Sequence, residues 1–373
     1  MRVLMTGGGT GGHVNPALAI AEIIKANQPD SEIAFVGTKR GIENRLVPKA
    51  GYELYHINIQ GIRRSLSLSN LKTAYLVLTS PSHAKKLIRQ FKPDIVIGTG
   101  GYVCWPLLKA ASMMGIPTVV HESNAVAGVA VKQLKNRVDV IMTNFESTAK
   151  GLDAKAKVMR VGNPIGADFG RIDKAEARRA LGIPNSIKTV ILSCGGSLGA
   201  RKVNEAALGV MRDVVSKRSD VMHFHASGRN DAEYAKQMLC EYGLEKNENI
   251  VMSEYIYNMP ALMAAADIVI CRAGAMTLSE LAAVGRAAVI IPSPNVTDNH
   301  QYKNAKVLAD AGAALLVEEK ELESGRLTAE IEKLVSDTCA RKDLEENISK
   351  FASRDVGRTI YEEICRLVRE KKK

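Results

Sequence analysis

The feature that most constrains the fold is a glycine-rich stretch at residues 7–12, in which only Thr10 is not glycine. It follows a short apolar run at residues 2–6 that predicts a buried strand. Apolar residues then recur at helical spacing, so we expect a helix beginning near Asn15, with Pro16 at its first helical position. A strand, a glycine turn and a helix N-terminus together form an anion site, because unpaired N–H groups and the helix dipole point the same way. His13 is the titratable residue at this site.

The same stretch fits the dinucleotide pattern, with Gly7, Gly9 and Gly12 as its glycines. That interpretation needs an acid at the end of the second strand to hold a ribose. The second strand is expected near residues 32–36, and the four residues that follow it, Gly37 to Arg40, contain no acid. Lys39 and Arg40 have the charge to hold a 2′-phosphate. An NADP-dependent oxidoreductase therefore stays as a weaker alternative, beside a turn of purely structural use.

Length and composition favour an ordinary multidomain globular protein. The chain has 373 residues, of which 46% are hydrophobic and 24% are charged, and the length indicates two or three domains. No apolar run approaches the roughly 18 residues of a membrane span, and we expect no signal peptide. The six cysteines are scattered without a C-x-x-C pair, which favours a reduced, cytoplasmic setting with free thiols and no zinc site.

The positive charge lies in the N-terminal part of the chain. Residues 1–163 contain 21 Lys and Arg against 10 Asp and Glu, whereas the rest of the chain contains 30 of each kind. Between Leu54 and Pro93 there is no acid, and the basic residues there are Arg63, Arg64, Lys72, Lys85, Lys86, Arg89 and Lys92. This segment is either a solvated face or a surface for anionic lipid or nucleic acid.

Strand-like runs alternate with helical runs along the whole chain, which indicates parallel sheets with crossover helices. We expect the first series of strands near residues 2–6, 32–37, 53–58, 94–100, 117–122, 138–143 and 157–161. After a break at Gly162-Asn163-Pro164, a second series is expected near residues 189–194, 221–226, 249–254, 267–271, 287–292 and 313–317. The predicted fold class is therefore α/β, with two doubly wound Rossmann-like domains at residues 1–163 and 164–351, facing each other across a cleft. A final helix near residues 352–373 carries an apolar stripe.

Three further glycine turns follow expected strands, at residues 98–102, 195–200 and 273–277. Ligands of doubly wound sheets bind outside the carboxyl ends of the strands, so these turns predict a cleft for phosphates, with a pyrophosphate as the simplest ligand. Packing of helices against strands explains some of the glycines. No Asp-x-Asp or His/Cys/carboxylate cluster stands at ligand spacing, so we expect no metal and no cofactor.

Several polar residues near these turns can be interpreted either as structural or as ligand-binding residues. Thr277 to Glu280 fits a capping box, but Glu280 also has the carboxylate that a ribose diol binds. Asn124 follows an expected strand and has the donor and acceptor that a sugar hydroxyl needs. Asp298 is a candidate N-cap of the next helix, and Gln301, one turn on, has the same donor–acceptor pair as Asn124.

Taken together and in order, these motifs resemble the MurG family of GT-B glycosyltransferases (family 28), which act in peptidoglycan synthesis. The resemblance covers nearly the whole chain. It rests on Gly8-Gly9-Thr10-Gly11-Gly12-His13, Gly98-Thr99-Gly100-Gly101-Tyr102, His121-Glu122-Ser123-Asn124, Gly162-Asn163-Pro164, Gly195-Gly196-Ser197, Gly274-Ala275-Met276-Thr277-Leu278-Ser279-Glu280 and Asp298-Asn299-His300-Gln301-Tyr302.

The resemblance implies an inverting transferase that moves GlcNAc from UDP-N-acetylglucosamine to the 4-hydroxyl of MurNAc in lipid I, giving lipid II. Residues 164–351 would bind the donor, and residues 1–163 would face the acceptor and the membrane, with the final helix packing back on them. Carried over by position, the residues expected at the donor are Thr10, Gly11, Gly12, Asn124, Ser197, Ile256, Ala275, Met276, Thr277, Leu278, Ser279, Glu280 and Gln301. Ile256 would meet the uracil through its backbone. The setting would be peripheral, at the cytoplasmic face of the cell membrane on an anionic surface, with other cell-wall synthesis proteins as further partners and no nucleic acid.

His13 is the expected general base, with Glu122 next, because an inverting displacement must remove the proton of the attacking hydroxyl. The sequence departs from the family at two places. Gly166 stands where many members have Arg, so Arg201 or Arg272 would have to neutralise the donor phosphates, and Leu198 stands where many have Gln. A GT-B transferase with another lipid or natural-product acceptor, and a nucleotide-sugar binder without catalysis, are the remaining alternatives.

Overall fold

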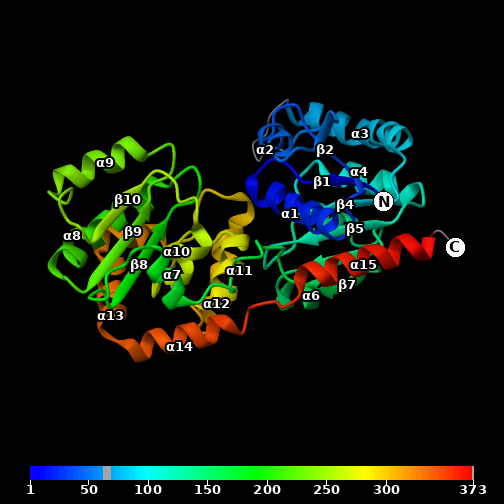
Figure 1. The fold of residues 1–373 in the computed structure, drawn as a ribbon. Coiled ribbons are helices and arrows are strands. Elements are labelled where there is room, and N and C mark those ends of the chain that lie inside the picture. Colours follow the sequence, from blue (N-terminus) through cyan, green and yellow to red (C-terminus); the bar gives the residue numbers. More distant parts are fainter. Residues whose placement is uncertain (62–68, 372–373) are drawn as a thin grey trace. The chain divides into compact units, whose positions relative to one another are not determined.

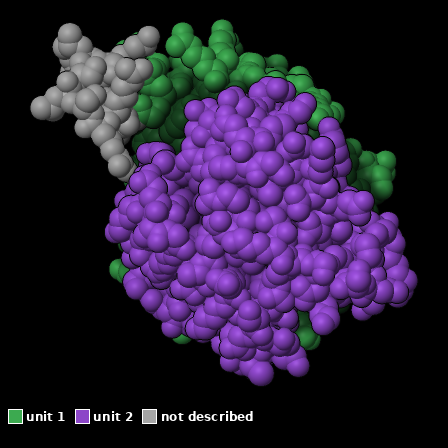
Figure 2. All heavy atoms as spheres, turned by 90° about the vertical axis from the view of Figure 1, so that its left-hand side faces the viewer, with its two compact units in different colours: residues 1–165, 353–373 green, residues 166–352 purple. Residues whose placement is uncertain are grey.

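The computed structural model describes residues 1–61 and 69–371, and the side chains of residues 69–72 and 74 are outside the description. The chain divides into two compact units (Figure 2). Unit 1 comprises Met1–Ile165 and Ser353–Lys373, and unit 2 comprises Gly166–Ala352. Both units alternate strands and helices, so the expected α/β class with two doubly wound sheets is confirmed.

Unit 1 contains a parallel sheet of seven strands in the order β3-β2-β1-β4-β5-β6-β7. Its strands are short apolar runs, most of them buried on both faces, as parallel strands covered by helices must be. They are β1 (Arg2–Thr6), β2 (Glu32–Gly37), β3 (Glu53–His56), β4 (Ile95–Gly98), β5 (Thr118–Glu122), β6 (Val140–Thr143) and β7 (Lys157–Arg160).

Helices cover both faces of this sheet (Figure 1). The helices are α1 (Gly11–Asn27), α2 (Glu43–Lys49), α3 (Ser69–Phe91), α4 (Cys104–Met113), α5 (Val129–Leu134), α6 (Glu146–Gly151) and α15 (Val356–Lys371). One core lies between the sheet and helices α1, α2 and α15, and a second core lies between the sheet and helices α3, α4 and α5.

Helix α15 is the last helix of the chain and belongs to unit 1, although residues 166–352, which precede it, form unit 2. Ile360, Ile364 and Leu367 recur at helical spacing and are buried in the core that α1 also lines. Glu363, on the same face, is buried and lies 3.0 Å from Lys157 Nζ at the start of β7. An apolar stripe and a half-buried ion pair thus fix the last helix to the first sheet.

Unit 2 repeats the plan with a parallel sheet of six strands in the order β10-β9-β8-β11-β12-β13. The strands are β8 (Thr189–Cys194), β9 (Val221–Ala226), β10 (Ile250–Ser253), β11 (Ile268–Cys271), β12 (Ala287–Ile290) and β13 (Leu315–Leu316). The helices are α7 (Lys174–Ala180), α8 (Arg201–Asp213), η1 (Val215–Lys217), α9 (Ala232–Glu241), α10 (Met259–Ala265), α11 (Ala275–Val284), η2 (Thr297–Asn299), α12 (His300–Asp310), η3 (Glu319–Ser324), α13 (Arg326–Ser336) and α14 (Thr338–Ser349).

In each sheet the strand order reverses once, next to the first strand of the series. The reversal lies between β1 and β4 in unit 1 and between β8 and β11 in unit 2. Crevices for ligands form at such switch points, outside the carboxyl ends of the strands. All four predicted glycine turns follow these four strands, so each unit has one candidate site.

Three expected helix starts are wrong. Helix α1 begins at Gly11, with Pro16 inside it, because the glycines of the turn themselves adopt helical geometry. Helix α11 begins at Ala275 after Gly274, so Thr277 is not an N-cap, the capping box does not form, and Glu280 lies in the second turn. Asp298 has φ 57° and precedes the helix, which begins at His300 after Asn299.

No helix within the described ranges is both long enough and apolar enough to span a lipid bilayer.

Candidate active site

In unit 1, the turns after β1 and β4 meet at His13. The Thr99 hydroxyl donates to the His13 carbonyl at 2.6 Å, which ties the second turn to the first turn of α1. Gly100 has φ +104°, and a Cβ there would lie 2.9 Å from His13 Nδ1, so only glycine lets the turn approach the ring. The partly exposed imidazole therefore sits at the switch point of the sheet, as predicted from the glycine motif.

The start of α1 is an open anion site. Among the described residues, the N–H groups of Gly11 and Gly12 have no acceptor, and the Thr10 side chain does not cap the helix. These groups lie beside His13 in the same turn of helix. A phosphate oxygen could therefore accept hydrogen bonds next to the imidazole.

Residues 37–40 contain no acid, as the sequence shows, but the carboxylate of an acid from the next helix reaches the loop after β2. Glu43, the first residue of α2, is 1% exposed. Its carboxylate accepts hydrogen bonds from the N–H of Gly9 at 3.1 Å and of Thr38 at 2.9 Å. It is thus buried within the glycine loop rather than available for a ribose, which argues against the NADP alternative.

The loop after β5 holds Asn124 through its neighbour Glu122. The Glu122 carboxylate is buried and accepts from the backbone N–H and Nδ2 of Asn124, at 3.0 and 3.1 Å, and from Gly128 N–H at 2.7 Å. With these bonds made, Glu122 is a structural anchor, and its rank as the second candidate base is not supported. His121 is also buried, and burial lowers its pKa to about 4, so it too is structural.

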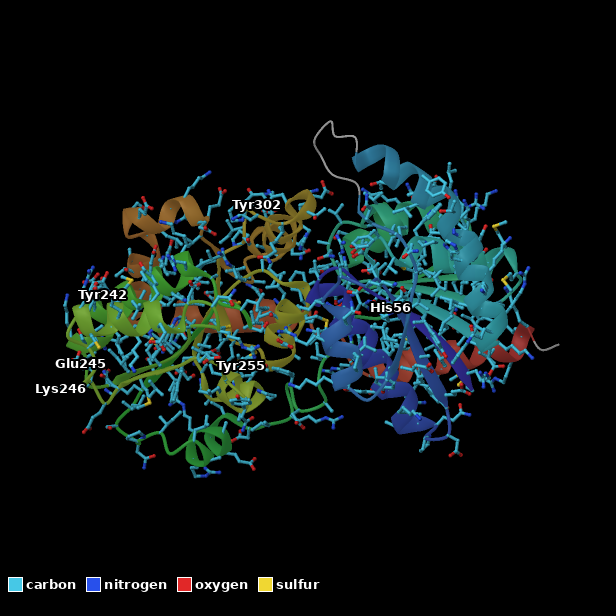
Figure 3. All side chains as sticks on the ribbon, turned by 90° about the horizontal axis from the view of Figure 1, so that it is seen from above. His56, Tyr242, Glu245, Lys246, Tyr255 and Tyr302 are labelled. Carbon is cyan, nitrogen blue, oxygen red and sulfur yellow. The ribbon has the colours of Figure 1, made fainter. Side chains whose placement is uncertain are left out.

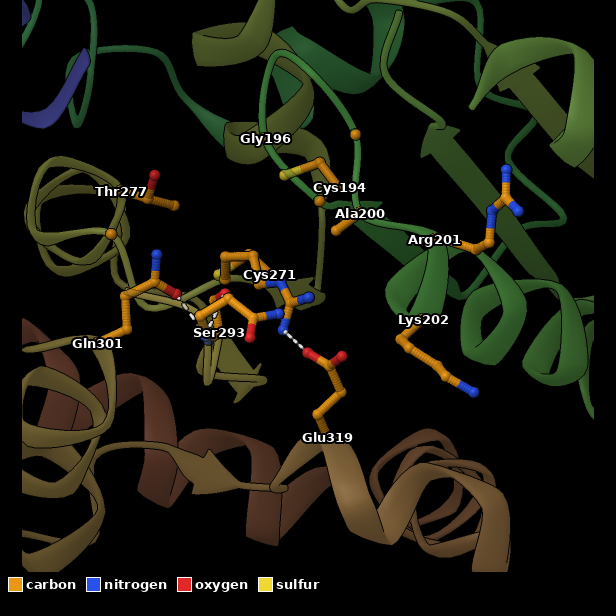
Figure 4. A pocket seen from close by; sticks show the side chains of 15 residues that line it. Cys194, Gly196, Ala200, Arg201, Lys202, Cys271, Thr277, Ser293, Gln301 and Glu319 are labelled. Carbon is orange, nitrogen blue, oxygen red and sulfur yellow. Dashed lines mark hydrogen bonds and ion pairs between the residues drawn. The ribbon is translucent and has the colours of Figure 1, made fainter. Parts of the chain in front are cut away.

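In unit 2, a pocket of about 540 Å³ lies at the switch point between β8 and β11 (Figure 4). Its walls come from the glycine turn after β8, the start of α8 and the loops after β11 and β12. The lining residues are Cys194, Gly195, Gly196, Gly199, Ala200, Arg201, Lys202, Cys271, Arg272, Gly274, Thr277, Ser293, Asn295, Gln301 and Glu319. Two of the predicted donor residues, Thr277 and Gln301, are therefore in this pocket.

Each cationic side chain in the pocket has an acidic partner. Arg272 forms an ion pair with Glu319, which is labelled in Figure 4, and their nearest charged atoms lie 2.7 Å apart in a geometry outside that of a directed hydrogen bond. Arg201 lies 3.3 Å from Asp231, and Lys202 lies 2.8 Å from Glu323. Arg201 and Arg272, the two predicted substitutes for the missing Arg, thus line the pocket with their charge already compensated. Glu319 was not found by sequence reasoning, because nothing in its helical context marks it.

Glu280 is the carboxylate without such a partner. No hydrogen bond or ion pair reaches it from the described part of the chain. Burial raises the pKa of the pocket thiols Cys194 and Cys271, and the charge of Glu280 adds a smaller increase to both, so its carboxylate lies near the pocket. Burial raises the pKa of Glu280 to about 7. A desolvated acid without a partner next to a pocket is a candidate for binding ligand hydroxyls.

The other predicted donor residues of unit 2 differ in how exposed they are. The Gln301 carbonyl oxygen accepts from Ser293 N–H at 2.9 Å, which leaves the Nε2 group for a ligand. Ser197 is exposed in the glycine turn, whereas the side chains of Ala275 and Leu278 are buried, so these two offer a ligand only their backbone. Met276 and Ser279 are half-buried in the first turns of α11. Ile256 is buried, whereas its sequence neighbours Tyr255 (Figure 3) and Tyr257 are exposed and have ring centroids 5.0 Å apart.

The comparisons with known proteins agree over the whole chain. Residues 3–143 match the glycosyltransferase family 28 N-terminal domain, and residues 190–359 match the family's C-terminal domain. The UDP-N-acetylglucosamine--N-acetylmuramyl-(pentapeptide) pyrophosphoryl-undecaprenol N-acetylglucosamine transferase of Thermoanaerobacter sp. (strain X514) is 41% identical over 361 residues, covering 97% of this chain and 98% of the relative. The transferase of the same name from Acetivibrio thermocellus is 40% identical over 371 residues, with 100% and 99% covered. The crystal structure of Acinetobacter baumannii MurG is similar, with a TM-score of 0.78, 29% identity and coverage of 98% and 99%.

Two doubly wound parallel sheets in one chain, together with the family matches over most of its length, identify a glycosyltransferase of the GT-B fold. The chain belongs to glycosyltransferase family 28.

Proposed function

We propose that this glycosyltransferase moves GlcNAc from UDP-GlcNAc to the 4-hydroxyl of MurNAc in lipid I, with inversion, to give lipid II. The named activity of relatives about 40% identical over nearly the full chain supports the reaction. The observation that carries the donor site is the pocket at the β8/β11 switch point with the unpartnered Glu280 beside it.

In this proposal unit 2 binds the donor. Glu280 accepts hydrogen bonds from the ribose hydroxyls, and the Ile256 backbone contacts the uracil. Gln301 Nε2 and Thr277 meet the sugar, together with backbone groups of residues 275–279. Ser197 contacts the donor from the glycine turn. Thr10, Gly11, Gly12 and Asn124 of unit 1 are the further substrate-binding residues of this proposal.

The phosphates are held mainly by backbone dipoles. Because Arg201, Lys202 and Arg272 each have an acidic partner, the described side chains that line the pocket offer no uncompensated positive charge. The N–H groups of Arg201 and Lys202, at the start of α8, have no acceptor within the described residues. Oriented N–H groups stabilise the charge that develops on the leaving diphosphate, which accounts for a working site with Gly166 in place of the family's Arg.

The chemical step is a single displacement at the anomeric carbon. The MurNAc 4-oxygen forms the new bond to this carbon while the bond to the phosphate oxygen breaks, and UDP leaves with the electron pair. The hydroxyl proton passes to the His13 imidazole, which releases it to water. In this proposal, the acceptor pyrophosphate binds the N–H groups of Gly11 and Gly12 beside His13, which have no acceptor among the described residues.

We also propose that α3 faces the anionic inner surface of the cell membrane, as a peripheral contact. Tyr75 is 66% exposed and Leu78 is 79% exposed, and Lys86 and Arg89 follow on the same helical face. Leu87 and Phe91 of the same helix pack on the core of unit 1 and do not belong to this face. Arg63 and Arg64, and the side chains of Leu71 and Lys72, lie outside the described residues.

A turnover assay with UDP-GlcNAc and a lipid I analogue tests the reaction. We expect a product with GlcNAc on the MurNAc 4-oxygen in the β configuration, formed with one UDP per transfer. An analogue with a blocked 4-hydroxyl is the matched control and should give no product. Transfer to this control, or transfer only to an acceptor without MurNAc, would contradict the proposal and favour a related GT-B activity.

A further inference from the structure

We propose that Glu43 is a positioning residue: its buried carboxylate occupies the Gly9 end of the first glycine loop and directs an acceptor phosphate to the α1 end, beside His13. The inference rests on the proposed function for the identity of that phosphate. The contacts of Glu43 carry the argument.

The Glu43 carboxylate joins two loops that are far apart in sequence. One oxygen accepts from Thr38 N–H at 2.9 Å and from the Thr38 hydroxyl at 3.0 Å, and the other accepts from Gly9 N–H at 3.1 Å. The loop after β2 and the loop after β1 are thereby fixed to one anion. At 1% exposure, this anion is shielded from water, so its hydrogen bonds are strong.

The surrounding backbone is shaped to admit this side chain. A Cβ at Gly41 would lie 1.9 Å from a Glu43 oxygen, and a Cβ at Gly37 would lie 2.5 Å from Glu43 Cγ. A Cβ at Gly8 would lie 3.0 Å from the other oxygen. Three glycines from three segments therefore leave room for one carboxylate, which is more than a helix-start glutamate needs for its own helix.

The consequence is a division of the loop into a closed part and an open part. Gly9 N–H is engaged, and the negative charge beside it opposes a second anion at that point. Gly11 and Gly12 keep their N–H groups at the start of α1. A phosphate thus has one favourable position in this loop, and that position adjoins the imidazole that takes the proton.

The variant Glu43→Gln tests this contact with almost no change in volume. A carboxamide has one oxygen, which stays with the two Thr38 donors, so its NH₂ group faces Gly9 N–H and that hydrogen bond is lost. We expect amide exchange at Gly9 to accelerate about ten- to a hundredfold while exchange at Thr38 keeps its protection. Glu53→Gln, on the exposed edge of β3, is the matched control and should change neither amide.

The kinetic readout separates positioning from stability. Well below the melting temperature, Glu43→Gln should lower kcat/KM for the acceptor about tenfold or more while the donor Kd stays as in the parent protein. A lower melting temperature with unchanged acceptor kinetics would mean a structural role and overturn the inference, and so would unchanged exchange at Gly9. The exchange measurement needs no turnover, so it tests the hydrogen bond between Gly9 and Glu43 even if the parent protein does not transfer GlcNAc. Failure of the parent protein to transfer GlcNAc would reject the proposed function instead.

Discussion

The glycine turns after β1 and β8 have the same backbone arrangement, but they differ in what occupies them. Both follow the first strand of a parallel series, and both lead into a helix without a side-chain cap. In unit 1, the buried carboxylate of Glu43 fills part of the turn. In unit 2, the turn opens on a pocket of about 540 Å³, and Glu280 beside it has no partner in the described chain. The difference teaches that a glycine turn marks a possible anion site, while the nearby carboxylates decide what it holds.

The two units also differ in how their charges are distributed. Residues 1–163 carry the entire excess of basic residues, yet the anion inside their glycine loop comes from the protein itself. The pocket of unit 2 has three cations, each paired with an acid. Long-range charge and local phosphate binding are therefore separate properties here, assigned to different surfaces.

The largest effect is expected at His13, which separates catalysis in unit 1 from donor binding in unit 2. General base catalysis contributes typically 10²–10⁴-fold, so His13→Ala should lower kcat by that factor with little change in donor affinity or melting temperature. His83→Ala, an exposed histidine on α3, is the matched control in an assay with a soluble acceptor. A kcat within about threefold of the parent protein would require another base, and a raised acceptor KM alone would make His13 a binding residue.

The second largest effect is expected for Glu280, beside the pocket of unit 2, and it concerns donor binding. Loss of a charged hydrogen-bond acceptor costs roughly 1.5–3 kcal/mol, so Glu280→Ala should raise the donor KM about ten- to a hundredfold. Because burial raises the pKa of Glu280 to about 7, this carboxyl group is about half protonated near neutral pH in the protein without donor. Ribose hydroxyls that donate to the carboxylate favour its charged form, so donor affinity should rise with pH from 6 to 8.

Calorimetric titration of the donor at several pH values checks this dependence. Glu280→Gln should bind weakly and without the pH dependence, whereas Glu233→Gln, on the exposed side of α9, should match the parent protein. A donor KM that stays constant while the melting temperature falls would show that Glu280 serves only the helix. The capping box that would explain such a result does not form in this structure.

Much of the fold follows from the sequence, because parallel strands buried on both faces are continuous apolar runs between glycine turns. The runs at residues 2–6, 189–194 and 221–226 coincide with β1, β8 and β9. The ends of the helices were harder. Local rules favour Asn15 and Asp298 as caps, but the tertiary placement of each turn decided where the helix starts.

Only some residues of the candidate sites could be predicted from the sequence. His13 and Glu280 belong to motifs with a physical reason for their position, and the structure places both beside glycine turns at switch points. Glu43 and Glu319 were missed because their partners, Gly9 and Arg272, are distant in sequence. Contacts of that kind depend on how loops from different strands converge, which periodicity and spacing do not contain.

Acid should destabilise the protein through buried neutral histidines. Burial lowers the pKa of His121 and His225 to about 4, and that of His223 further, so the unfolded chain binds more protons between pH 6.5 and 4. The free energy of unfolding should therefore fall as the pH falls through this window, by about 1.4 kcal/mol per pH unit and histidine. Urea unfolding at pH 7 and pH 5 measures the change.

Glu280 works in the opposite direction, which gives this experiment its control. Its folded pKa lies above the unfolded value, so protonation below pH 7 favours the folded state and offsets one histidine of unit 2. Glu280→Gln should remove this offset and steepen the loss of stability toward pH 5, whereas Glu233→Gln should not. Equal stability of the parent protein at pH 7 and pH 5 would mean that the buried histidines are not the acid-sensitive groups.

The smallest effect is expected for single charges on α3, where the basic excess of residues 1–163 meets an exposed apolar face. Each basic residue near an anionic surface contributes about 1 kcal/mol, so Lys86→Gln should lower binding to phosphatidylglycerol vesicles about fivefold. Lys246→Gln, an equally exposed lysine on unit 2, is the matched control and should bind like the parent protein. Sedimentation with vesicles at increasing salt should show weaker binding and a smaller difference between the variants, because salt screens exposed charges. Equal binding to neutral and anionic vesicles would leave Tyr75 and Leu78 as the only contribution of this face, and unit 1 would then contact the membrane through apolar side chains rather than through its charge.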